Sequence, residues 1–283
     1  MRFAGLPVNH LSEFSSADAL IKYSHLRSGN PGQKLLMLHG AGVAGDLTWR
    51  FVTSYLEGWS EIVIPDLPGM GQSDFLFDRA PLTEDYLDAI CGLVKQLDWE
   101  EIALVGYSFG GLLAIELLNA LSAVTSLVLI EPAALLSSEA ADLSMRAIQY
   151  ESLAAAIRKD PAAPAPYLEF LNTVSPRRVR NASIDRMAVE RLMNRGTGLA
   201  DGIGAVSESL TKRATEYAGW VSPVAGCSLV GGLSSQSMHQ RHEKLSQRSP
   251  DWTSHVIDAS DHGLVYTRPR EIAKIINARI LIG

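Results

Sequence analysis

A serine flanked by glycines is the residue of this 283-residue chain that best suits nucleophilic chemistry. The pentapeptide GYSFG at 106–110 follows the apolar run 102–105, which predicts a buried strand, and precedes the helix-like run 112–121. In so tight a strand-to-helix turn, the central side chain stands exposed at the head of the helix, where N–H groups and the helix dipole stabilise an oxyanion. The pattern favours Ser108 as the nucleophile of an acyl transfer, and an ordinary strand-to-helix turn is the alternative interpretation.

Strands and helices alternate around this turn. Apolar runs at 34–38, 61–65, 102–105 and 126–130 predict buried strands, and the spacing over 83–97 predicts an amphipathic helix. Continuous apolar strands that alternate with helices are typical of a parallel α/β sheet covered on both faces, whose ligands bind beyond the carboxyl ends of the strands. His39, Ser108 and Glu131 each follow such a strand, so we expect them to share one rim.

The remaining elements complete this plan. Residues 133–221 contain helix-like runs separated by proline-rich and glycine-rich segments, including 195–204, and predict a helical cap inserted after the strand that ends at Ile130. Residues 1–132 and 222–283 then form the core domain. The other expected elements are an edge strand at 19–25, a short helix at 51–56, strands at 223–230 and 255–258, and helices at 143–157, 167–174, 184–193, 236–247 and 269–281.

Composition excludes several function classes. The net charge is −6 and no long block of lysine or arginine occurs, which argues against nucleic acid or a stable membrane association as a partner. Cys91 and Cys227 are expected to be reduced thiols. No secretory leader and no apolar stretch of about 18 residues is evident, so we expect a cytoplasmic protein. The oligomeric state stays open.

A few polar residues outside the serine turn also invite a functional interpretation. Asp66 and Asp74 lie in a loop rich in glycine and proline, where carboxylates usually accept backbone N–H bonds. His239 and His242 are spaced so that they could share a metal, but no third ligand stands out, and we expect an exposed helix face. Arg177, Arg178 and Arg180 form a small basic run that could meet an anionic substrate, but we expect a solvated face or a helix end. We therefore predict neither a metal nor a cofactor.

The chain resembles the α/β-hydrolase superfamily. The resemblance depends on HGAG at 39–42, DLPGMGQSD at 66–74, GYSFGG at 106–111 and DH at 261–262, in this order and each after a predicted strand. It implies that Ser108 is the nucleophile and that His262 is the general base and then acid. It also implies an oxyanion hole made by the amides of Ala41 and Phe109, and substrate contacts from Gly40 and Tyr107.

The acid of the implied triad departs from the usual pattern. Most of the superfamily carries it after the strand that is here 227–230, in a G-x-x-D arrangement, but this chain has Ser234 there. Some relatives, such as haloalkane dehalogenases, instead carry the acid after the strand before the cap, and that position is Glu131. A strand-ending glutamate is the alternative, with Asp258 and Asp261 as other candidate acids.

A serine nucleophile argues against dehalogenase and epoxide hydrolase chemistry, because those relatives use an aspartate. The expected function is a carboxylesterase that acts on small to medium soluble esters through an acyl-enzyme. A carbon–carbon bond hydrolase of aromatic ring-cleavage products, a lactonase and a cofactor-free perhydrolase remain alternatives. A small-ligand receptor with little turnover is the alternative from another class.

Overall fold

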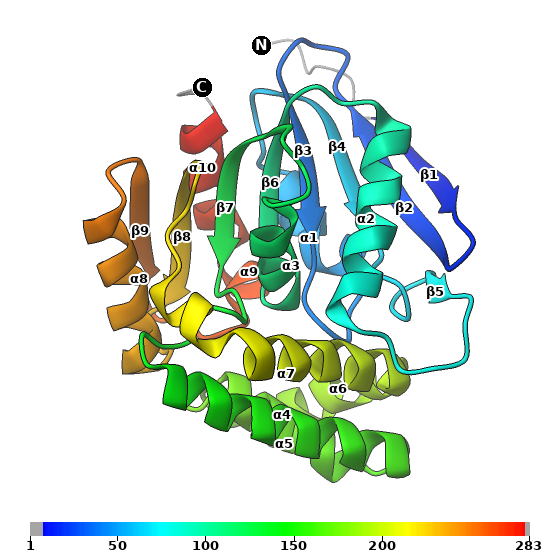
Figure 1. The fold of residues 1–283 in the computed structure, drawn as a ribbon, viewed down its shortest axis with the longest axis vertical. Coiled ribbons are helices and arrows are strands. Elements are labelled where there is room, and N and C mark those ends of the chain that lie inside the picture. The colour runs from blue at the N-terminus through cyan, green and yellow to red at the C-terminus, as the bar shows by residue number, and fades with distance from the viewer. Residues whose placement is uncertain (1–7, 281–283) are drawn as a thin grey trace.

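The computed structural model describes residues 8–280. The described strands form one mixed sheet in the order β1-β2-β4-β3-β6-β7-β8-β9, and β5 pairs with β2 outside this path (Figure 1). The strands are β1 Val8–Ser15, β2 Ala19–Arg27, β3 Gln33–Leu38, β4 Trp59–Pro65, β5 Asp74–Phe75, β6 Ile102–Tyr107, β7 Val124–Ile130, β8 Ala225–Gly231 and β9 Trp252–Ile257. Along this order, each strand from β4 to β9 pairs in parallel with the next, whereas β2 pairs antiparallel with β1, β4 and β5. The predicted α/β class with a mostly parallel sheet is confirmed.

Helices cover both faces of the sheet. On one face lie α2 Thr83–Leu97, α3 Phe109–Leu117 and α8 Gln236–Arg248, and on the other lie α1 Gly45–Thr53, α9 Leu264–Thr267 and α10 Pro269–Ile280. Alternate residues of β3 enter the two cores: Leu36 and Leu38 pack toward α2 and α3, whereas Leu35 and Met37 pack toward α1 and α10. The parallel strands read as continuously apolar because both of their faces are buried.

Two predictions for the elements around the sheet are wrong. The segment 19–25 is no edge strand, because β1, which the sequence pattern does not predict, pairs with the outer side of β2. Helix α1 begins at Gly45 and ends at Thr53, so the prediction of 51–56 is wrong in both bounds. The amide of Gly45 donates to the Asp66 carboxylate at 2.7 Å, which stabilises this early helix start. The predicted end of the last helix at Leu281 lies outside the described residues.

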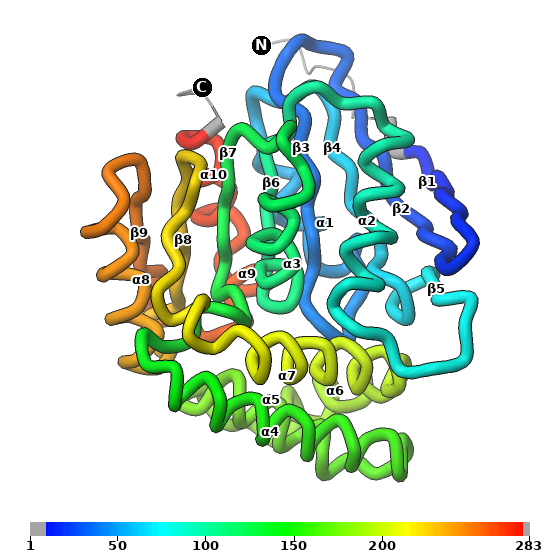
Figure 2. Tube along the Cα trace, in the orientation of Figure 1, coloured from blue at the N-terminus to red at the C-terminus, as the bar shows by residue number. Residues whose placement is uncertain are grey.

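Four helices lie between β7 and β8: α4 Ala140–Lys159, α5 Pro164–Val174, α6 Ala182–Met193 and α7 Gly196–Gly219. They cross the carboxyl ends of the parallel strands as a separate layer, which is most easily followed in the chain trace (Figure 2). We call residues 133–221 the helical insertion. Its position at this end of the sheet puts it next to the rim on which Ser108, His262 and Glu131 are expected.

The predicted break at 195–204 is wrong, because α7 runs through all the glycines of that segment. A Cβ at Gly198 would lie 2.0 Å from the Gly69 carbonyl oxygen, so the absent side chain lets α7 touch the loop that follows β4. Glycine here serves close helix packing and not a turn.

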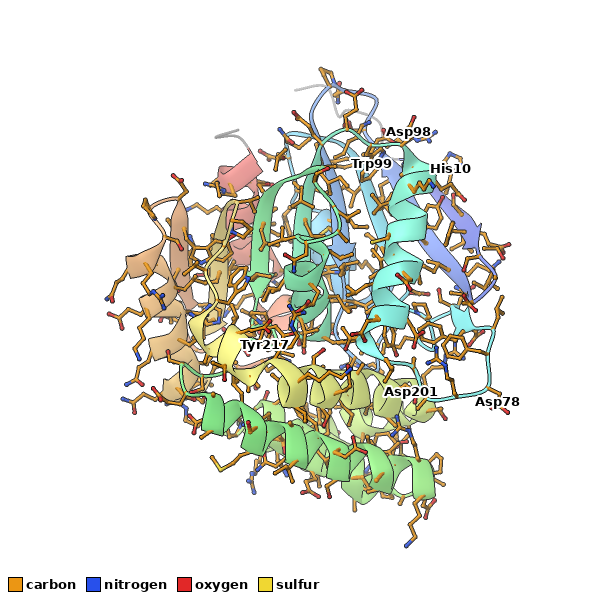
Figure 3. All side chains as sticks on the ribbon, viewed as in Figure 1. His10, Asp78, Asp98, Trp99, Asp201 and Tyr217 are labelled. Carbon is orange, nitrogen blue, oxygen red and sulfur yellow. The ribbon has the colours of Figure 1, made fainter. Side chains whose placement is uncertain are left out.

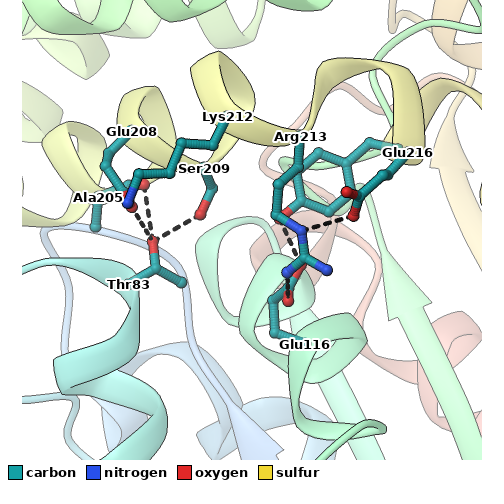
Figure 4. Close-up of polar contacts among 9 residues, drawn as sticks. Thr83, Glu116, Ala205, Glu208, Ser209, Lys212, Arg213 and Glu216 are labelled. Atoms are coloured by element: carbon teal, nitrogen blue, oxygen red, sulfur yellow. Dashed lines mark hydrogen bonds and ion pairs between the residues drawn. The ribbon is translucent and has the colours of Figure 1, made fainter.

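Polar contacts hold α7 against the helices that cover the sheet. The Thr83 hydroxyl lies 2.7 Å from the Ser209 hydroxyl and 2.9 Å from the Ala205 carbonyl oxygen (Figure 4). Farther along α7, Arg213 pairs with the buried Glu116 of α3, which also accepts the Tyr217 hydroxyl at 2.5 Å. In Figure 3, Tyr217 lies near the end of the sheet that the insertion covers, and Trp99 lies near the other end of the sheet. The helix that covers the rim is therefore held at two separate points.

Candidate active site

Ser108 occupies the turn between β6 and α3. Its φ of 54° and ψ of −115° are rare for a residue with a side chain. A Cβ at Gly110 would lie 2.4 Å from the Leu38 carbonyl oxygen, so this close contact with the end of β3 requires glycine. The turn places Ser108 immediately before the first residue of α3, where the sequence pattern predicts it.

His262 connects Ser108 to Glu131. It lies in the loop after β9, with Nε2 3.0 Å from Ser108 Oγ and Nδ1 2.6 Å from Glu131 Oε2. Tyr107 is predicted to contact substrate, but its hydroxyl donates to the His262 carbonyl oxygen at 2.8 Å and its ring centroid lies 5.1 Å from that of the imidazole. An imidazole held in this way can accept a hydroxyl proton while a carboxylate stabilises its charged form.

Glu131 is fully buried, with an exposed fraction of 0%, and has a φ of 43°. Its Oε2 faces His262, and its Oε1 accepts the amide of Gly231 at 2.7 Å and the hydroxyl of Ser234. The serine at the usual acid position thus supports a carboxylate that comes from the neighbouring strand. A buried carboxylate needs such partners, because a charge without them is costly away from water.

The other candidate acids lie elsewhere. Asp261 accepts the amide of Gly263 at 2.8 Å through Oδ1, and Asp258 is exposed to solvent. The Nδ1 atom of His262 has Glu131 as its partner. The geometry therefore favours Glu131 over both aspartates.

Arg177 connects the helical insertion to the loop that supports Glu131. Its Nε donates to the Leu233 carbonyl oxygen at 3.1 Å, and its Nη2 donates to the carbonyl oxygens of Gly232, at 3.4 Å, and Ser234. The expectation of a solvated surface is therefore incomplete for Arg177. Arg178 also has a partner, because it pairs with Asp185 on α6. Nothing in the local sequence marks Arg177, because its partners are backbone carbonyl groups about 55 residues away.

His39 and the aspartates after β4 shape the loops of the rim. The buried His39 donates through Nδ1 to the Gly40 carbonyl oxygen at 2.7 Å and accepts the Leu67 amide at Nε2 at 2.8 Å. Burial lowers the pKa of His39, so its neutral form fits these two bonds. Asp66 accepts two backbone amides, and Asp74 pairs with Arg195, so both carboxylates have structural contacts.

The predicted oxyanion donors belong to two segments that adjoin Ser108. Phe109 is the first residue of α3, and Ala41 lies in the loop after β3. A Cβ at Gly40 would lie 3.2 Å from Ser108 Cβ, so the backbone of this loop runs directly beside the serine. The oxyanion role of both amides and the substrate contacts of Gly40 and Tyr107 stay predictions.

A cavity of about 260 Å³ opens at Ser108, Glu131 and His262. Its remaining described lining comes chiefly from α4, the end of α5 and the loop before α8. Tyr107, Gly40, Ala41 and Phe109 are outside this lining. Sequence reasoning missed the residues that α4 contributes, namely Asp142, Met145, Arg146, Gln149 and Tyr150.

The prediction that His239 and His242 lie on an exposed helix face is wrong for His242. It is fully buried in α8, whereas His239 is partly exposed. Burial, together with the neighbouring Arg241 and His239, lowers the pKa of His242 to about 3. Within residues 8–280, no cluster of three or more histidine, cysteine or acidic side chains could hold a metal ion.

Two further observations concern the thiols and the helices. Cys91 and Cys227 are both free, and burial raises the pKa of Cys227 to about 12. None of the described helices has the length and hydropathy needed to cross a bilayer.

A serine, a histidine and a glutamate gathered at the carboxyl ends of a mainly parallel sheet are the arrangement that α/β hydrolases use. A sequence model of the alpha/beta hydrolase family matches residues 35–275, and this chain belongs to that family. The predicted resemblance is therefore confirmed.

Individual relatives match shorter segments. The chain is 32% identical over 96 residues to 2-hydroxymuconate semialdehyde hydrolase of Pseudomonas sp. (strain CF600), which covers 33% of this chain and 34% of that protein. It is 33% identical over 90 residues to the magnesium-chelatase 30 kDa subunit of Rhodobacter capsulatus, which covers 30% of each. The matches thus span about a third of the length of these curated relatives.

Solved structures match over almost the whole chain. A thermophilic esterase from Thermogutta terrifontis superposes with a TM-score of 0.71 at 16% identity and covers 98% of both chains. A bromoperoxidase from Bacillus anthracis superposes with a TM-score of 0.70 at 18% identity and covers 97% of this chain and 99% of its own. At these identities the similarity establishes the fold.

Proposed function

We propose that this hydrolase is a carboxylesterase that cleaves small to medium soluble esters through Ser108, His262 and Glu131. The observation that carries the proposal is the hydrogen-bonded chain from Ser108 Oγ through both imidazole nitrogens to Glu131, with separations of 3.0 and 2.6 Å. A hydroxyl becomes a nucleophile when a base takes its proton, and the base needs a carboxylate that fixes its tautomer.

In the first half of the reaction, Ser108 Oγ forms a bond to the ester carbonyl carbon while His262 Nε2 takes its proton. The amides of Ala41 and Phe109 hold the resulting oxyanion. When this intermediate collapses, the bond to the alcohol oxygen breaks and His262 returns the proton to the leaving alcohol. Glu131 stabilises the imidazolium that exists between these two proton transfers.

In the second half, water attacks the acyl-enzyme. His262 removes a proton from this water, the new oxyanion occupies the same pair of amides, and the bond to Ser108 Oγ breaks as the serine regains its proton. The products are a carboxylic acid and the free enzyme. The helical insertion over the rim limits the access of bulk water to these steps.

Substitution of the nucleophile tests this proposal. Ser108→Ala removes the attacking atom, so hydrolysis of 4-nitrophenyl butyrate by the purified variant should fall to the uncatalysed rate, and a fluorophosphonate probe should no longer label the protein. Ser237→Ala is the matched control, because Ser237 lines the same cavity and its hydroxyl lies 3.0 Å from that of Ser235. Unchanged turnover by Ser108→Ala would show that the esterase proposal is wrong.

A carbon–carbon bond hydrolase is the second candidate. The segmental similarity to 2-hydroxymuconate semialdehyde hydrolase favours it. Turnover of a vinylogous diketo acid, compared with that of a simple ester, distinguishes the two reactions. A receptor function predicts a different pattern, namely no fluorophosphonate labelling of Ser108 and thermal stabilisation by a bound ligand.

A further inference from the structure

An arginine from the helical insertion lies in the same cavity as Ser108 and His262. Arg146 is a partly buried residue of α4 and lines the cavity together with Tyr150 of the same helix and Thr173 near the end of α5. The position of α4 over the rim is visible in Figure 1. A positive charge therefore shares a cavity of about 260 Å³ with the proposed nucleophile.

The protein orients this guanidinium but uses little of its bonding capacity. Arg146 Nη1 donates to the Thr173 carbonyl oxygen at 2.9 Å, and the guanidinium carbon lies 5.7 Å from the ring centroid of Tyr150. An arginine has five N–H donors in a rigid fork, so the hydrogen bond to Thr173 and the contact with Tyr150 leave part of the fork available. The contact with α5 fixes the direction of the side chain.

The arginine also has no carboxylate partner among the described ion pairs. Four other arginines of the insertion do have one: Arg158 with Asp201, Arg178 with Asp185, Arg195 with Asp74, and Arg213 with Glu116 and Glu216. Arg146 differs from them because it faces the cavity.

Two carboxylates share the cavity lining with Arg146, and both have other partners. Asp142, one turn earlier on α4, accepts the Ser137 hydroxyl at 2.7 Å. Glu131 accepts His262 with one oxygen and the loop after β8 with the other. The guanidinium is thus left to bind an acceptor that enters from solution.

We propose that Arg146 binds a carboxylate carried by the substrate, so that the preferred substrates are esters with a second, anionic end, such as hemi-esters of short dicarboxylic acids. The planar fork of arginine matches a carboxylate, and charge-assisted hydrogen bonds of this kind are strong in a partly desolvated site. The inference rests on the proposed esterase function for its reaction, but the binding step can be measured separately.

The kinetic test compares charged and neutral esters of equal chain length. The charged probes are the mono-4-nitrophenyl esters of succinate, glutarate and adipate, and the neutral ones are the esters of butyrate, valerate and hexanoate. The wild-type protein should favour at least one charged ester about tenfold in kcat/KM over its neutral counterpart. Arg146→Gln should lower kcat/KM for that charged ester about ten- to a hundredfold and leave the neutral ester within about twofold.

Two variants separate charge from folding. Arg146→Lys keeps the positive charge and should retain part of the preference for the charged ester. Arg186→Gln removes one positive charge from an exposed position on α6 and should retain all of it. An equal loss with charged and neutral esters in Arg146→Gln would assign Arg146 a structural role and overturn the proposal.

A binding measurement distinguishes failure of this inference from failure of the esterase proposal. The free dicarboxylates, titrated by calorimetry, should bind wild-type protein and Ser108→Ala alike and bind Arg146→Gln about tenfold more weakly or worse. The Arg146 inference is wrong, even if neutral esters are hydrolysed, in two cases. Either no dicarboxylate binds, or every dicarboxylate binds the wild type and Arg146→Gln equally. If Ser108 proves unreactive while a dicarboxylate binds through Arg146, only the esterase proposal fails.

Discussion

Replacement of Glu131 by glutamine tests the role of the acid most directly, because it removes a charge and almost no volume. The glutamine oxygen can still accept the Gly231 amide and the Ser234 hydroxyl, which now bond Oε1 of the glutamate. Its NH₂ group would then face His262 Nδ1, where Oε2 now lies at 2.6 Å. A donor at this position favours the imidazole tautomer that carries its proton on Nε2.

The wrong tautomer presents an N–H to Ser108 and cannot take the serine proton. In a serine protease, the comparable change of aspartate to asparagine lowers kcat about ten-thousandfold while the geometry persists. We expect Glu131→Gln to lower kcat for 4-nitrophenyl butyrate by about a thousand- to ten-thousandfold, equivalent to about 4–5.5 kcal/mol of transition-state stabilisation. The KM should change little, because the cavity keeps its shape.

The assay needs a control in which a buried carboxylate is lost away from the site. Glu116→Gln is this control, because Glu116 is only 5% exposed and pairs with Arg213 of the helical insertion. This control should lower the unfolding temperature and retain kcat per folded molecule to within a few-fold. Activity of Glu131→Gln within tenfold of the wild type would refute Glu131 as the acid.

Two further substitutions test the surroundings of the site. Arg177→Gln removes the contacts with the loop 232–234 and should lower kcat for 4-nitrophenyl butyrate about three- to tenfold with little change in KM. The control Arg180→Gln, at an exposed position, should keep the wild-type kcat. Equal kcat values in the two variants would contradict a positioning role of Arg177. The pKa of His242 is about 3 in the folded protein and 6.5 in the reference state, so the unfolded chain binds the extra proton between these values and stability falls as the pH drops below about 6.5. The free energy of unfolding, measured with urea at pH 7 and pH 5, should decrease between these pH values by up to about 2 kcal/mol less in His242→Leu than in the wild type. His239→Gln should show the same decrease as the wild type.

The sequence is sufficient to predict the nucleophile turn and the sheet around it, because both depend on local patterns. Gly106 and Gly110, two residues before and after Ser108, leave no room for a side chain, and the parallel strands are apolar on both faces. The glycines of α7 mislead for a physical reason: Gly198 has no side chain because α7 touches Gly69, and no local pattern distinguishes such packing from a turn. Arg146 is missed because its place in the cavity depends on how α4 crosses the rim.

The proposed catalytic carboxylate can come from the end of either of two neighbouring strands. Strands β7 and β8 are parallel partners, and the Glu131 amide donates to the Leu229 carbonyl oxygen at 3.0 Å, so the loops after both strands start side by side. The Glu131 side chain reaches across to the loop after β8 and meets Ser234 there. An aspartate at 234 would place two carboxylates against each other, whereas a serine donates a hydrogen bond. The serine at position 234 therefore suits a carboxylate that is supplied from the end of β7.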